Sequence, residues 1–135
     1  MARKCEHMIS SSDGKRAIYI DSENKEEILT YLRQDNRHKK KFRFITDIIL
    51  GGHKNTELYD KEEINDKCKG VTTMKFFKGQ ENDRIYCKEI YSNEGTFIIV
   101  TAILHERKKS SSLSSKEKVI INRVGGYEYE IQGKV

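Results

Sequence analysis

The chain has 135 residues, of which 36% are hydrophobic and 35% charged, and its formal net charge is +5. This length fits one domain with its own core, and the positive charge permits a polyanionic partner without requiring one. The apolar runs are too short for a membrane-spanning helix and the N-terminal segment lacks the apolar core of a signal peptide, so we expect a cytoplasmic protein with no membrane association. Cys5, Cys68 and Cys87 share no CxxC spacing, which predicts reduced, packed thiols rather than disulfides or a zinc site.

The first half of the chain predicts strands and helices in the following order. Residues 1–15 are polar, rich in Ser and non-periodic, which indicates a loose leader or at best a short strand. Residues 16–21 (RAIYID) place apolar side chains on both sides of a strand. Caps and apolar stripes at helical spacing then predict a helix from Ser22 to about Gln34, a second helix from about Asn36 to Gly51 that forms a hairpin with the first, and a short third helix capped by Asp60 and Glu63 and ended by Gly70.

In the second half the apolar period changes from helical to two. This pattern predicts three strands, at residues 71–78, 84–91 and 96–105. The segments GQEND and SNEG between them have the composition of turns, so we expect an antiparallel meander. The third strand is continuously apolar from Phe97 to Val100, as is typical of a central strand buried on both faces. A capping box at Ser114 and Glu117 then predicts a C-terminal helix, followed by an alternating tail, YEYEI, that can add a strand.

The predicted fold class is therefore α+β. Residues 16–135 are expected to form one domain, in which an N-terminal strand and a helix hairpin pack on an antiparallel β-meander with a C-terminal helix.

Basic residues concentrate on and around the meander. Two-residue alternation places Arg84 and Lys88 on one face of their strand, and Lys75 joins them if the register allows. Such a group of cations can hold a phosphodiester and stabilise the charge that develops on it, which is a route to RNA cleavage without a metal ion. The alternative for each residue is a solvated surface cation. The further members of this basic set are Lys78, Arg107, Lys108 and Lys109.

One histidine and two tyrosines add further candidates. His105, at the end of the central strand, suits a general acid or base, or a packed or exposed surface residue. Tyr127 and Tyr129 alternate in the tail and can stack on RNA bases, or pack back onto the sheet. A Gly-rich phosphate loop, a nucleophile elbow and a Cys–His pair are not found in the sequence, and we expect no cofactor and no metal.

Three short sequence motifs, which occur in the same order along the chain as in that family, resemble the RelE/ParE toxin superfamily, most closely its HigB or phage-derived HigB-like branch. The first is GVTTMKF at 70–76, which is similar to the strand of that family that ends in E-L-R. The second is RIYC at 84–87, which is similar to Y-R-I-x-Y. The third is ILHERKKS at 103–110 with the following SSKEKVI, which is similar to L-L-H-G-F-x-K-K-T and T-P-x-x-E-I. The similarity covers roughly Arg16 to Val124 and implies a RelE-like fold.

The resemblance implies a bacterial toxin of a type II toxin–antitoxin system, an mRNA interferase that cleaves mRNA on the ribosome without a metal ion. It implies attack by the ribose 2′-hydroxyl on the adjacent phosphate. Lys75 matches the basic position of the first motif, and Arg84 matches the arginine of the second. In the third motif, His105 matches the histidine, and Lys108 and Lys109 match the paired lysines. The expected partners are mRNA on the ribosome and a cognate antitoxin, a small helix-turn-helix protein that covers the basic face.

This sequence also departs from the family pattern. Thr73 stands where E-L-R has its acid, Glu106 and Arg107 replace a small and an aromatic residue, and the proline before the last helix is missing. These changes keep a second hypothesis open: a non-cleaving binding module of the same fold, either a ParE-like topoisomerase inhibitor or an inactive antitoxin-binding relative. Both activities occur on one fold, so topology cannot separate them.

Overall fold

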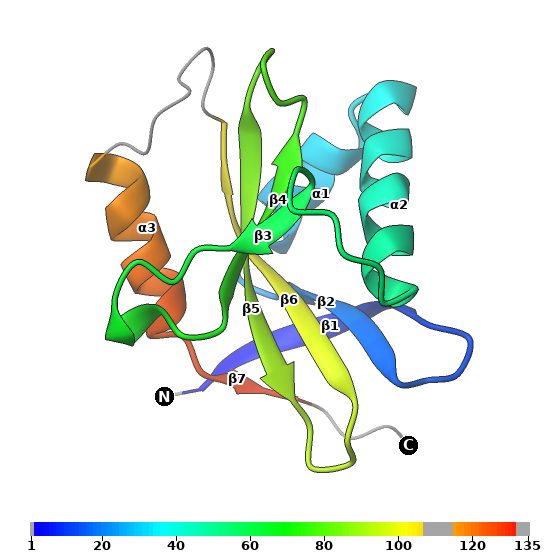
Figure 1. Cartoon of the computed structure of the whole chain (residues 1–135), viewed down its shortest axis with the longest axis vertical. Helices are drawn as coiled ribbons and strands as arrows, with labels where there is room; N and C mark the ends of the chain where they lie inside the picture. The colour runs from blue at the N-terminus through cyan, green and yellow to red at the C-terminus, as the bar shows by residue number, and fades with distance from the viewer. Residues whose placement is uncertain (1, 107–114, 132–135) are drawn as a thin grey trace.

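The computed structural model describes residues 2–106 and 115–131, and in these ranges three α-helices pack on one curled, seven-stranded sheet (Figure 1). The elements in chain order are β1 (Arg3–Ser10), β2 (Arg16–Asp21), α1 (Lys25–Arg33), α2 (Asn36–Leu50), β3 (Tyr59–Lys61), the 3-10 helix η1 (Asp66–Cys68), β4 (Val71–Phe76), β5 (Asp83–Tyr91), β6 (Phe97–His105), α3 (Ser115–Gly125) and β7 (Tyr129–Glu130). The predicted α+β class is confirmed.

The strand order is β3-β4-β5-β6-β2-β1-β7. Strands β4, β5 and β6 form the predicted antiparallel meander, and β2 lies parallel to β6 on its other side. The prediction that the third meander strand is central is confirmed, because β6 pairs with β5 from Phe97 to His105 and with β2 from Phe97 to Thr101. Its residues Ile98, Ile99 and Val100 are all buried, which accounts for the continuous apolar run.

Helices cover the two faces of the sheet unequally, as Figure 1 shows, with α1 and α2 on one side and α3 on the other. Ile28 and Leu32 of α1 and Ile45 of α2 belong to a core cluster with buried residues of β2, β4, β5 and β6. On the opposite face, the apolar side of α3 packs on Val71, Tyr86 and Ala102, adding Ile120, Ile121 and Val124 to a second cluster. Each fully buried aliphatic side chain stabilises the fold by roughly 1.5–3 kcal/mol.

The helix hairpin is confirmed, with one change at its start. Helix α1 begins at Lys25 after Asn24, and Ser22 is not its cap; the Ser22 hydroxyl donates to Glu6 instead. No side chain caps α1; the buried carboxylate of Asp21 instead fixes the turn before the helix, because its Oδ1 accepts hydrogen bonds from the backbone N–H groups of Glu23 and Asn24.

Two predictions about the N-terminal half need correction. Of the two alternatives for residues 1–15, a loose leader or a short strand, the structure has a strand from Arg3 to Ser10, which pairs with β2 from Cys5 onward and with β7 at Arg3 and Lys4, and Cys5 is buried. The expected third helix is replaced by β3 and the short η1. Here Tyr59–Lys61 pairs with β4, and the Glu63 carboxylate accepts from the N–H of Gly70 rather than capping a helix.

The C-terminal predictions are confirmed within the described residues: α3 ends at Gly125, and the tail adds β7, parallel to β1. All three cysteines are buried free thiols. No helix in the described ranges has the length and apolar character needed to cross a membrane.

Candidate functional site

Lys75, Arg84 and His105 lie side by side across the meander. Lys75 on β4 is paired with Arg84 on β5, and Arg84 is paired with His105 on β6. Directly paired residues of antiparallel strands project on the same face, so the three side chains form one row. We call these residues the cross-strand row. The register that Lys75 needs to join Arg84 is therefore the one observed.

The β4–β5 turn sets this register. Phe77 and Asn82 both adopt the left-handed region, with φ of 55° and 57°. The backbone N–H of Asn82 donates to the Phe77 carbonyl, and the Asn82 side chain accepts from the N–H of Gly79 at 2.8 Å. Asparagine tolerates positive φ more readily than most residues, whereas Phe77 is held there by burial at 8% exposure.

Carboxylates from the β3 region lie beside the two cations of the row. Arg84 Nη1 lies 3.8 Å from Glu62 Oε1, and Lys75 Nζ lies 3.8 Å from Asp60 Oδ2 while donating to the Thr56 carbonyl at 3.0 Å. Both basic side chains are 15% exposed. Burial, followed by the repulsion of Arg84, lowers the pKa of Lys75 below its ordinary value. The row is therefore cationic but loosely balanced by the chain's own acids.

A buried polar pair lies on the same face, next to the row. Tyr86, two residues after Arg84, donates its hydroxyl to Glu117 Oε2 at 2.7 Å, and the Glu117 side chain is almost wholly buried. Burial and this hydrogen bond raise the pKa of Tyr86. Thr73 is paired with Tyr86 across the strands, and its buried Oγ1 has no hydrogen-bond partner among the described residues.

Sequence reasoning missed this pair as part of the site. The sequence places Glu117 only in a capping box at the start of the C-terminal helix. The two-residue alternation that places Arg84 and Lys88 on one face of β5 also places Tyr86 there. This alternation is the sequence signal from which the position of Tyr86 beside Arg84 could be predicted.

Lys88 shares the face of Arg84 but does not join the row. Its Nζ donates to the carbonyl of Gly125, at the last residue of α3, at 2.7 Å. Glu117 in the first turn of α3 contacts Tyr86, next to the row, and Gly125 at the end of α3 contacts Lys88. The helix therefore runs along β5 from the neighbourhood of the row to Lys88. Burial lowers the pKa of Lys88. Its geometry is that of a helix C-terminal cap.

The remaining predicted cations divide into two groups. Lys78 is exposed in the β4–β5 turn, near enough for its charge to contribute to the lowered pKa of Lys75. Arg107, Lys108 and Lys109 lie outside the described residues, directly after the end of the β6 strand and Glu106.

Tyr127 and Tyr129 lie at the β7 edge of the sheet, and the row lies on β4, β5 and β6. The Tyr129 hydroxyl donates to Asp21 Oδ2 at 2.6 Å, and the Arg3 guanidinium lies 4.0 Å from the centre of the Tyr127 ring. Arg3 also donates to both oxygens of Asp21. The fold therefore gives both tyrosines packing partners and does not bring them to the row.

In residues 2–106 and 115–131, no three His, Cys, Asp or Glu side chains gather as a possible metal site.

Comparison of the chain with protein-family models, with curated proteins and with solved structures gave no match.

Proposed function

We propose that this protein is the toxin of a type II toxin–antitoxin pair and cleaves mRNA on the ribosome. The observation that supports this most is the cross-strand row, in which Lys75, Arg84 and His105 share one face of the meander in direct register. Two cations beside an imidazole can bind a phosphate group and place a side chain capable of proton transfer next to it. The arrangement of β2, the α1–α2 hairpin, the meander and α3 also agrees with a RelE-like fold, which we propose for this chain.

In the proposed reaction, a ribose 2′-oxygen attacks the adjacent phosphorus. The bond from phosphorus to the 5′-oxygen breaks, leaving a 2′,3′-cyclic phosphate and a 5′-hydroxyl. Lys75 and Arg84 hold the phosphate and stabilise the charge that develops on its oxygens. His105 accepts the proton of the 2′-hydroxyl, and the 5′-oxygen takes up a proton from water. Lys108 or Lys109 adds positive charge, and no metal or cofactor is needed for the step.

The proposed antitoxin, a small helix-turn-helix protein, would place an acidic or amphipathic segment over the row. Glu62 and Asp60 already face Arg84 and Lys75 at 3.8 Å, which demonstrates that carboxylates can approach both cations. A partner's acidic side chains would compete with Glu62 and Asp60 for these cations and would exclude RNA.

The same contacts favour a second candidate, a non-cleaving binding module of this fold. Asp60 and Glu62 offset part of the charge of the row, and Thr73 supplies no acid where the family pattern has one. A ParE-like protein would inhibit supercoiling by purified gyrase without cleaving RNA. An inactive antitoxin-binding relative would do neither and would still bind the antitoxin.

Induction of the gene in a bacterium, followed by mapping of mRNA 5′ ends, tests the leading proposal. We expect growth arrest and new ends inside translated codons. Arg84→Gln should lower the frequency of these ends by roughly 10²–10³-fold, as for loss of one transition-state donor. Lys61→Gln, which removes an exposed cation from the neighbouring strand β3, is the matched control and should leave them unchanged. Ends that persist undiminished with Arg84→Gln would overturn the assignment.

A further inference from the structure

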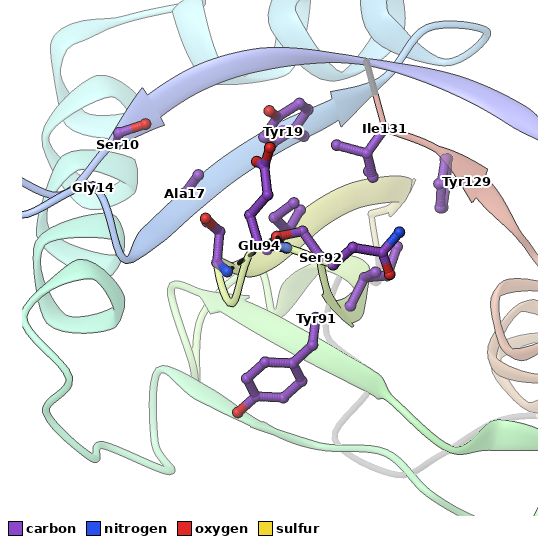
Figure 2. Close-up of a pocket in the computed structure, with 13 residues that line it drawn as sticks. Ser10, Gly14, Ala17, Tyr19, Tyr91, Ser92, Glu94, Tyr129 and Ile131 are labelled. Carbon is purple, nitrogen blue, oxygen red and sulfur yellow. Dashed lines mark hydrogen bonds between the residues drawn. The ribbon is translucent and has the colours of Figure 1, made fainter. Parts of the chain in front are cut away.

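A pocket of about 390 Å³ opens on the face of the sheet that carries α3, away from the cross-strand row. Its lining comes from the β1–β2 turn, β2, the β5–β6 hairpin and the β7 segment, which lie around it in Figure 2. Ala17 and Ile98 are buried and form its apolar floor, with Ile90 and Ile131 partly buried beside them. A volume of this size accommodates a small organic group.

Two tyrosines that line the pocket are held in place by contacts outside it. The Tyr129 hydroxyl is bound to Asp21, whose carboxylate is in turn held by two hydrogen bonds from Arg3. The Tyr19 ring meets the His7 ring edge to face, with ring centroids 5.3 Å apart. The aromatic surfaces are therefore already in position before a ligand arrives, which lowers the entropic cost of binding.

Among the residues that the structure describes, Glu94 is the one charged residue that lines the pocket, and it is exposed on the β5–β6 turn. Figure 2 shows its side chain extending from the β5–β6 turn across the pocket toward Tyr19. The turn is fixed by Ser92 Oγ, which accepts from the N–H groups of Glu94 and Thr96. Among the described residues, no cation forms an ion pair with the Glu94 carboxylate. Burial, with a contribution from Glu94, raises the pKa of Tyr19, so its hydroxyl stays neutral.

We propose that this pocket binds an alkylammonium group. Its methylene chain would lie on Ala17 and Ile98, and its charge between the Glu94 carboxylate and the face of a tyrosine ring. Aromatic faces attract cations, and an unpaired carboxylate beside an apolar surface selects a cation that carries a hydrocarbon chain. An anion would be repelled by Glu94, and a neutral apolar ligand would leave its charge unused. The ammonium can belong to a free amine or to a lysine side chain of a partner protein.

This site is independent of the proposed RNA cleavage. None of its lining residues belongs to the cross-strand row, and its charge has the opposite sign. A failure of either proposal therefore leaves the other standing.

An NMR titration of the full chain at low salt tests the proposal, with the Ile90, Ile98 and Ala17 methyl groups as reporters. The probes are n-hexylammonium chloride and hexan-1-ol, which share a chain and differ in charge. We expect n-hexylammonium to shift these methyl signals and to bind roughly two- to fivefold more tightly than hexan-1-ol, the range of an exposed charge pair. In Glu94→Gln this preference should disappear. Glu57→Gln, an equal charge change at an exposed residue that does not line the pocket, should keep it.

A third probe, Nα-acetyl-lysine N-methylamide, separates the two sources of the ammonium group. Binding that matches n-hexylammonium supports a lysine of a partner protein, and selective binding of n-hexylammonium supports a free amine. Equal affinity for n-hexylammonium and hexan-1-ol would overturn the proposal, as would an undiminished preference in Glu94→Gln. Absence of any shift in the reporter methyl groups would overturn it as well.

Discussion

Replacing Tyr129 with phenylalanine separates a packing role from a role in stacking on RNA. The change removes only the hydroxyl that donates to Asp21 at 2.6 Å, and it keeps the aromatic face. A hydrogen bond to a charged group contributes about 1.5–3 kcal/mol. Asp21 keeps hydrogen bonds from Arg3, Glu23 and Asn24, so we expect a loss near the lower limit, about 1.5 kcal/mol. With a urea slope of roughly 1.5 kcal/mol per M, the midpoint should fall by about 1 M.

The matched control is Tyr127→Phe, because the Tyr127 ring packs under Arg3 and no hydrogen bond from its hydroxyl is present in the described structure. Its midpoint should shift by less than about 0.3 M.

Burial alone would raise the pKa of Asp21, but hydrogen bonds from Arg3 and Tyr129 outweigh it and hold the pKa below 3.8. The stability contributed by this ionised carboxylate is therefore present above pH 3.8 and is lost as the pH falls through the lowered pKa. The difference between Tyr129→Phe and the parent should shrink in the same range. Equal midpoints for the two variants at neutral pH would refute the reasoning.

Three further predictions concern α3 and the cysteines. Gly125→Ala should destabilise the fold by about 2 kcal/mol in urea melts, because the added Cβ would overlap the backbone carbonyl oxygen of Lys67; an unchanged midpoint would contradict this packing. Lys88→Met should cost about 1 kcal/mol of stability and leave RNA affinity in filter binding unchanged, since its Nζ caps α3; weaker RNA binding at unchanged stability would reverse that assignment. Burial raises the pKa of Cys5 to about 11, so iodoacetamide at pH 8 should alkylate it far more slowly in the native protein than in urea, as followed by mass spectrometry. Equal rates would show that this thiol is accessible.

The sequence could predict the meander because its signal is local. Alternating side chains and short polar turns identify strands without knowledge of their partners, and the run from Phe97 to Val100 identifies the central one. The face shared by Arg84 and Lys88 followed from the same alternation. Pairing of Lys75 with Arg84 could not be predicted, because it depends on left-handed backbone at Phe77 and Asn82 in the connecting turn.

The elements that were missed depend on contacts between distant segments. Strand β1 is polar on one side and carries an irregularity between His7 and Ile9, so its strand character comes from pairing with β2 and β7. Asp60 and Glu63 have the spacing of a helix cap, yet pairing with β4 draws Tyr59–Lys61 into the sheet. Tertiary pairing overrides local preference in both cases.

The candidate site divides in the same way. Lys75, Arg84 and His105 were selected by residue type and order, and the fold brings them together. Lys88 was selected by the same reasoning, but the end of α3 occupies its ammonium group. Glu117 was overlooked because its carboxylate is directed toward Tyr86, a contact that no spacing within one helix can reveal.

Cleavage of a synthetic mRNA on purified ribosomes tests the central claim most directly. The message carries either an ordinary ribose or a single 2′-deoxyribose on the 5′ side of the cleaved phosphate. We predict cleavage of the ordinary message to a 2′,3′-cyclic phosphate, none at the 2′-deoxy position, and a rate at least roughly 10²-fold lower for Arg84→Gln with an unchanged melting temperature. Cleavage at the 2′-deoxy position, or a wild-type rate for Arg84→Gln, would contradict the account.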